Sequence, residues 1–183
     1  MTANDDTTLD DEPFDSGHPS LSMTVLMTPD LSNFAGNVHG GQLLKYLDQV
    51  AYTCASRNAG HYAVTLSVDR VVFREPIHVG ELVTFDASVN YTGRTSMEIG
   101  IRVTTEDLRL GKVRHTNSCY FTMVAVDDDR RPVPVPPWVP TTPVQLRREA
   151  AAKRRRELRR EMDRREEEIK EGHAALPTPG RDL

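Results

Sequence analysis

Asp48 is a candidate for chemistry because it interrupts a regular apolar pattern. Between residues 43 and 55 the apolar residues recur every three or four positions, which predicts one stripe on an α-helix. They are Leu43, Leu44, Leu47, Val50, Ala51, Cys54 and Ala55. Asp48 follows Leu47 directly, so its carboxylate is expected at the edge of the buried stripe. A single aspartate at this position is typical of the solvent border of an amphipathic helix. A carboxylate beside a buried stripe is nevertheless costly unless it is solvated, hydrogen-bonded or functional.

The loop in front of this helix adds a second group of candidate residues. Residues 36–41 read G-N-V-H-G-G. At the other end of the helix, Gly60 is expected to terminate it in a left-handed conformation. The pair Gly40 and Gly41 lets the backbone approach a ligand closely. The first amides of a helix have no internal partner, so an oxyanion or a polarised carbonyl can be held there. The alternative is a plain entry into a helix, with Asn37 as its cap.

The two stretches together resemble a known family. N-x-A-G-N-V-H-G-G at residues 33–41, followed by L-L-K-Y-L-D-Q-V-A at residues 43–51, is similar to the acyl-CoA thioesterases of the hotdog fold. The resemblance is to the brain-type acyl-CoA hydrolase group and its bacterial single-domain relatives, and it covers roughly residues 20–140.

This resemblance implies hydrolysis of acyl-CoA to a free fatty acid and coenzyme A, with Asn33 and Asp48 as the catalytic residues. Asp48 is expected to act as a general base or as a nucleophile, while the Asn33 amide holds the water or the carbonyl. His39, Gly40 and Gly41 are expected at the thioester carbonyl. No metal and no cofactor is expected, because coenzyme A is part of the substrate.

In the family, Asn33 of one subunit would face Asp48 of the other. A homodimer, assembled further into a trimer of dimers, is therefore the expected state. A single sheet of five strands also leaves open edges, which favours a dimer that extends the sheet. The strand over residues 64–73 is the expected seam, by resemblance to the family.

Coenzyme A carries phosphates, which arginine side chains and backbone amides recognise. Arg70, Arg74 and Arg94 are candidates for these contacts, and the turn that contains Arg94 adds Thr95 and Ser96. Each of them is also compatible with an ordinary surface position.

Composition narrows the remaining function classes. The chain has 183 residues and a formal net charge of −4, so no global basic field favours nucleic acid. Its two cysteines have no C-x-x-C spacing, which fits a reducing compartment. No apolar run reaches the length of a membrane span, and no lysine or arginine precedes Lys45. A cytoplasmic protein that binds neither nucleic acid nor membrane is expected.

Alternating apolar residues predict five strands, one before the helix and four after it. They fall at residues 21–27, 64–72, 83–91, 97–104 and 113–126, and the last one is apolar on both faces at its end, as in a central strand. The fold class is therefore α+β, a hotdog fold in which an antiparallel sheet wraps around one long helix, with an added charged helix at the C-terminal end.

The domain prediction has four parts. Residues 1–18 are expected to form a disordered acidic tail, and residues 19–140 the hotdog domain. Residues 141–172 are expected to be a Pro-rich linker and a charged helix with Arg and Glu at i, i+4 spacing. Residues 173–183 are expected to be a flexible tail. The basic cluster at residues 153–156 is typical of a solvated helix, with phosphate or nucleic acid as the alternative.

Two other functions stay open on the sequence. One is a hotdog sensor that binds acyl-CoA without cleaving it, which would be marked by loss of the catalytic carboxylate. The other is a hotdog enoyl-CoA hydratase or dehydratase, whose chemistry needs a histidine with an aspartate. His39 is near in sequence, but the family pattern assigns it to the loop.

Overall fold

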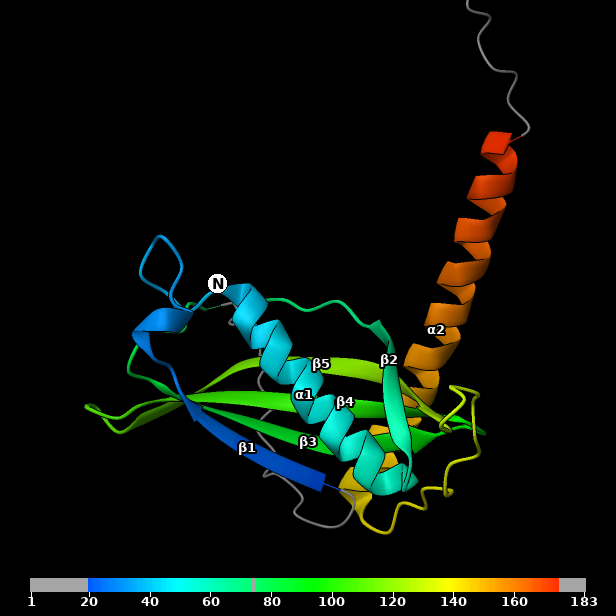
Figure 1. Ribbon diagram of the computed structural model, residues 1–183, viewed down its shortest axis with the longest axis horizontal. Helices are drawn as coiled ribbons and strands as arrows, with labels where there is room; N and C mark the ends of the chain where they lie inside the picture. Colours follow the sequence, from blue (N-terminus) through cyan, green and yellow to red (C-terminus); the bar gives the residue numbers. More distant parts are fainter. Residues whose placement is uncertain (1–19, 74, 175–183) are drawn as a thin grey trace, which may run out of the picture. The chain divides into compact units, whose positions relative to one another are not determined.

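Five antiparallel strands and one long helix form the larger part of the molecule (Figure 1). The computed structural model describes residues 20–73 and 75–174. The chain divides into two units, Met1–Val139 and Pro140–Leu183. Among the described residues, no helix has both the length and the apolar character to cross a bilayer. The predicted tail at residues 1–18 lies outside the described part, as does most of the one at 173–183.

The strands of the first unit form one sheet in the order β1-β3-β4-β5-β2. Their bounds are β1 Ser20–Leu26, β2 Tyr62–Val68, β3 Leu82–Thr92, β4 Ser96–Asp107 and β5 Lys112–Val126. Each neighbouring pair is antiparallel, and β5 is an interior strand between β4 and β2. All five predicted strands are present, and the fold class is confirmed.

Helix α1, Gly40–Ala59, lies across one face of this sheet (Figure 1). Its predicted apolar stripe is buried at six of seven positions, the exception being Leu44. The stripe packs on the alternate residues of β3, β4 and β5, among them Phe85, Ile99 and Phe121. Gly60 ends the helix with φ 67°, in the left-handed conformation expected of it.

Strand β2 is shorter than its sequence pattern predicted. The alternation continues to Val72, but the strand ends at Val68, and its register against β5 shifts between Thr65 and Ser67. A bulge of this kind reverses which side chains face the core, so the apolar pattern stops reporting burial. Leu66 is 68% exposed and Val68 43% exposed on this edge strand.

The second unit contains helix α2, Pro143–Ala174, which occupies most of the range predicted for the linker and the charged helix together. A capping box explains this start, because Thr142 Oγ1 accepts from the Gln145 amide while Gln145 Oε1 accepts from the Thr142 amide. Pro143 occupies the first helical position, where its missing N–H costs nothing. Predicted i, i+4 ion pairs form between Glu149 and Lys153 and between Glu161 and Arg165.

Candidate active site

The loop before α1 holds Asn33 through its own backbone. Ser32 and Val38 form an isolated β-bridge, which closes residues 33–37 into a small loop. Asn33 Oδ1 accepts from the amides of Ala35, at 2.9 Å, and Asn37, at 3.1 Å. The backbone amide of Asn33 in turn donates to the backbone carbonyl of Asn37 at 2.6 Å. Because the loop engages Oδ1, the side-chain Nδ2 is the group that Asn33 can present to a ligand, as a donor.

His39 caps α1, a role that the sequence pattern did not specify. Its Nδ1 accepts from the Gly41 amide at 2.9 Å, so the cap requires the tautomer with the proton on Nε2. A Cβ on Gly41 would lie 3.1 Å from that Nδ1, which is why glycine suits this position. Gly40 packs against the Phe73 ring, 3.4 Å from where its Cβ would be. The Gly41 amide is thus engaged within the chain, and the Gly40 amide is the better candidate donor for a ligand.

Asp48 lies on the exposed side of α1 and is hydrogen-bonded to β2. Its Oδ1 accepts from Thr65 Oγ1 at 2.6 Å, and that hydroxyl also lies 3.4 Å from Met123 Sδ. The sequence pattern did not indicate Thr65, which lies within the predicted strand over residues 64–72. The bond orients the carboxylate of a residue that is exposed to solvent.

Asn33 and Asp48 belong to different parts of the chain's fold. Asn33 precedes α1, while Asp48 stands eight residues into it. At 1.5 Å per residue, about 12 Å of helix separates Asp48 from Gly40. Within one chain these candidates therefore form two groups, the loop with the helix start and the middle of the helix.

The candidates for coenzyme A contacts lie elsewhere in the fold. Arg94, Thr95 and Ser96 belong to the tight turn between β3 and β4, closed by a 2.7 Å bond from the Gly93 amide to the Ser96 carbonyl. This turn lies toward the C-terminal end of α1, where Asn58 Nδ2 is 3.4 Å from Met97 Sδ. Arg70 is exposed just after β2, and Arg74 lies outside the described residues.

Neither cysteine is suited to nucleophilic catalysis. Burial raises the pKa of Cys54 and that of Cys119 to about 12, so both thiols stay protonated at neutral pH. In the described part of the chain, no three His, Cys, Asp or Glu side chains come together as a possible metal site.

Comparison with known proteins places this fold among thioesterases. The sequence model of the thioesterase superfamily matches residues 35–112. Protein VdlD of Helicobacter pylori strain 26695 is 50% identical over 139 residues, which cover 76% of this chain and 79% of VdlD. A crystal structure of an apo-hexameric acyl-CoA thioesterase superposes with a TM-score of 0.77 at 35% identity, covering 79% of this chain and 93% of that one.

An acyl-CoA hydrolase from Staphylococcus aureus is also similar in structure. It was solved in complex with butyryl coenzyme A, coenzyme A and coenzyme A disulfide, and it superposes with a TM-score of 0.76 at 30% identity, covering 86% of this chain and 96% of that one. Three further structures of that enzyme carry an alanine in place of an asparagine, an aspartate or a threonine. The extent of these matches shows that this chain belongs to the thioesterase superfamily, among the hotdog-fold acyl-CoA thioesterases.

Proposed function

We propose that this protein hydrolyses acyl-CoA thioesters, with Asp48 as general base, Thr65 as its orienting partner and Asn33 as a hydrogen-bond donor to the reacting groups. The observation that carries the proposal is the 2.6 Å hydrogen bond from Thr65 to the exposed Asp48 carboxylate. A carboxylate held in one orientation on a solvent-accessible face is suited to activating water.

The Staphylococcus aureus hydrolase supports the choice of residues. Its substituted asparagine and aspartate are fifteen residues apart, and its substituted threonine follows the aspartate by seventeen. Asn33, Asp48 and Thr65 have the same residue types at the same two spacings. Two spacings and three residue types that agree are stronger support than any single residue.

The proposed reaction begins when Asp48 accepts a proton from a water molecule. The water oxygen then attacks the carbonyl carbon of the thioester, and the resulting oxyanion is stabilised by N–H donors, for which Asn33 Nδ2 and the Gly40 amide are the candidates. As the C–S bond breaks, the proton passes from Asp48 to the sulfur of coenzyme A. The products are a fatty acid and the free thiol of coenzyme A.

The proposal includes a site shared between two subunits. Leu44, Asp48 and Tyr52 follow one another at i, i+4 spacing on the exposed side of α1. Tyr52 packs against Tyr62 of β2 with ring centroids 5.3 Å apart, and Leu66 of β2 is also exposed. An apolar surface around a carboxylate is typical of an interface or a ligand site. A second subunit on this face would bring its own Asn33 loop toward Asp48.

Further parts of the proposal concern the ligand and the assembly. Arg70, Arg74, Arg94, Thr95 and Ser96 are proposed to contact the phosphates of coenzyme A. The turn with Arg94 lies near the C-terminal end of α1, whereas the Asn33 loop precedes the N-terminal end of this helix. The turn and the loop of one chain are therefore expected to contribute to different active sites of the assembly. A trimer of dimers, located in the cytoplasm, is the proposed assembly.

Substitution of Asp48 tests the proposed function directly. Asp48→Ala should lower kcat on butyryl-CoA by roughly 10²-fold or more, because no other group at this position accepts the proton. Asn33→Ala should lower kcat more than it raises KM. The measurement is steady-state release of free thiol over a panel of acyl chain lengths, with Asp128→Ala, an exposed carboxylate outside α1, as the control. Wild-type turnover in the Asp48→Ala variant would refute this mechanism.

Isotope labelling separates a general base from a nucleophile. In a single turnover in H₂¹⁸O, the general-base route places ¹⁸O only in the fatty acid, because water attacks the thioester itself. A nucleophilic Asp48 would form an acyl anhydride, and attack of water on the aspartyl carbonyl of that anhydride would leave the label in the carboxylate of the protein, so a labelled peptide would contradict the general-base route. Mass spectrometry of the peptide that contains Asp48 should therefore show no label.

A further inference from the structure

We propose that Arg114 and Glu81 form a clamp that positions the Asn33 loop for the reaction. This inference rests on the proposed function for the role of Asn33, and it assigns to the ion pair a positioning role in that chemistry. The two residues lie far from Asp48 in sequence and contact neither Asn33 nor Asp48 directly, so their influence passes through the backbone between them.

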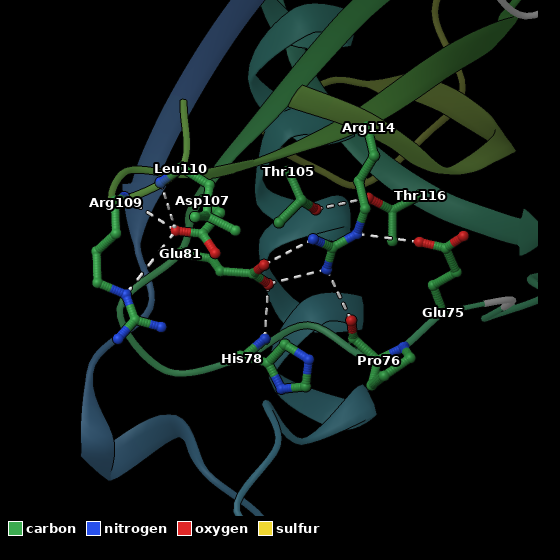
Figure 2. A network of polar contacts seen from close by, with 10 residues as sticks. All are labelled: Glu75, Pro76, His78, Glu81, Thr105, Asp107, Arg109, Leu110, Arg114 and Thr116. Carbon is green, nitrogen blue, oxygen red and sulfur yellow. Dashed lines mark hydrogen bonds and ion pairs between the residues drawn. The ribbon is translucent and has the colours of Figure 1, made fainter. Parts of the chain in front are cut away.

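The guanidinium of Arg114 binds three residues of the segment that precedes β3 (Figure 2). It donates to both carboxylate oxygens of Glu81, at 2.6 Å and 2.9 Å. It also donates to the Pro76 carbonyl at 2.8 Å, and its Nε lies 3.0 Å from Glu75 Oε2. A planar fork with five N–H donors can make these contacts together, which a lysine ammonium cannot.

Glu81 binds the same segment at its C-terminal end. Its Oε2 accepts from the His78 amide at 2.7 Å, and its backbone carbonyl accepts from the Met27 amide at 2.9 Å. The Gly80 amide donates to the Met27 carbonyl at 2.7 Å. Residues 76–81 are thus held by the side chain of a β5 residue on one side and by the end of β1 on the other.

This segment supports the loop that carries Asn33. The Val38 amide donates to the Ile77 carbonyl at 2.8 Å, and Asn37 forms a β-bridge with His78. Asn37 is also the residue whose amide and carbonyl bind Asn33. The path therefore runs from Arg114 through Pro76, Ile77 and His78 to Asn37 and Asn33, and every step is a hydrogen bond or a covalent connection.

The energetic cost of the pair argues for a specific role. The Glu81 side chain is 7% exposed and that of Arg114 21% exposed, so both charges are largely removed from water. Desolvation often offsets the attraction in such a pair, and an apolar pair of similar volume would fill the place at least as well. What an apolar pair lacks is the geometry that binds one carbonyl and one amide of the 76–81 backbone at once.

Arg114→Lys tests the clamp, because it keeps the charge near Glu81 and loses the fork. We expect kcat on butyryl-CoA to fall roughly tenfold while KM changes by less than about twofold, since the Asn33 loop is misplaced. Arg109→Lys, an exposed arginine in the β4–β5 hairpin 4.0 Å from Asp107, is the matched control and should keep wild-type kinetics. Thr116→Val breaks the buried hydrogen bond between the hydroxyls of Thr105 in β4 and Thr116 in β5, and it controls for lost stability. If Thr116→Val has the same Tm as Arg114→Lys and loses as much kcat, the proposal is overturned.

Hydrogen exchange gives a readout that does not depend on activity. In Arg114→Lys the amides of Asn37, Val38 and His39 should exchange faster, together with those of residues 77–81, while the β1–β3 ladder should exchange as in the wild type. If every segment exchanges faster, or the loop does not, the clamp is wrong. Should Arg114→Lys not fold, Glu75→Gln removes only the exposed outer contact and should give the same pattern at smaller size, with an unchanged loop again counting against the clamp.

A double-mutant cycle with Asn33 identifies the route. If Arg114 acts through Asn33, Arg114→Lys should change kcat by less than about twofold in an Asn33→Ala background, because the group that it positions is already absent. A full tenfold loss in that background would overturn the proposed route. The failures are distinguishable, because a wild-type protein that cleaves no acyl-CoA would refute the proposed function, whereas the exchange pattern tests the clamp without any turnover.

Discussion

At the scale of single residues, Asp48 and Thr65 form the pair on which the proposed chemistry depends. One residue comes from α1 and the other from the edge strand β2, and their side chains meet at 2.6 Å. A hydroxyl that donates to a carboxylate fixes its orientation without adding charge, so the carboxylate stays available as a base. The backbone of its own loop orients Asn33 in a comparable way through Oδ1.

Thr65→Val is the prediction at this scale. The valine keeps the shape of threonine and removes the hydroxyl, so Asp48 loses its orienting bond. Because a hydrogen bond to a charged group contributes about 1.5–3 kcal/mol, kcat should fall by roughly tenfold or more. Thr65→Ser restores the hydroxyl and should retain most of the wild-type kcat. Stopped assays of thiol release on both variants provide the measurement, and equal kcat values for them would show that the hydroxyl has no role.

At the scale of elements, two segments distant in sequence together set the start of α1. His39 caps the helix from the loop side, and the segment before β3 supports that loop through the bridge between Asn37 and His78. The ion pair of Glu81 with Arg114 connects this segment to β5. The position of the helix start is thus decided by hydrogen bonds from other elements as well as by the helix itself.

The pKa of Glu81 predicts how this arrangement responds to acid. Burial raises the pKa, but the hydrogen bonds from Arg114 and from the His78 amide, with the charge of Arg114 and a smaller effect of His78, outweigh it and leave the pKa below 4.5. A group whose pKa is lower in the folded protein than in the unfolded chain stabilises the fold. This stability is fully present above the pKa of the unfolded chain and is lost as the pH falls through the pKa of the folded protein.

Glu81→Gln is therefore expected to have a lower free energy of unfolding than the wild type at pH 7. This gap in free energy should be constant down to about pH 5 and should narrow below it. The gap narrows because the wild-type carboxylate becomes protonated and then resembles the amide. Urea unfolding at a series of pH values measures it. A gap that persists unchanged well below pH 4 would mean that the charge of Glu81 is not what stabilises the fold.

At the scale of the whole molecule, the exposed face around β2 indicates what the single chain lacks. Tyr62, Leu66 and Val68 are exposed on this edge strand, and Leu44 and Tyr52 of α1 are exposed as well, with Tyr52 packed against Tyr62. An open edge strand with apolar side chains is a surface that proteins usually cover. Asp48 lies within this surface, so a partner that covers it would also complete the proposed site.

Mixing two variants of strongly reduced activity tests whether sites are shared. Asn33→Ala and Asp48→Ala subunits, combined in equal amounts and exchanged, should recover roughly a quarter of the wild-type activity. Random pairing makes about half of the dimers mixed, and each mixed dimer contains one intact site and one doubly defective site. Each variant exchanged with itself is the control. If mass measurements confirm exchange and no activity returns, each site is built within one chain.

The sequence by itself determined the local elements of this protein. The three- and four-residue spacing of the stripe predicted α1, Gly60 predicted its end, and alternation predicted all five strands. The physical reason is that helix and strand periodicities reflect burial on one face, which neighbouring residues report directly. The fold class followed from the order of these elements and from the resemblance, because one apolar stripe needs one sheet to cover it.

The tertiary structure alone decided which distant side chains meet. The Asp48–Thr65 bond joins residues 17 positions apart and the Glu81–Arg114 pair joins residues 33 apart, and no spacing rule connects either pair. The early end of β2 had a similar cause, because its bulge between Thr65 and Ser67 depends on the register against β5. Such contacts depend on how strands pair and how a helix lies across them, and periodicity within one element carries no information about that.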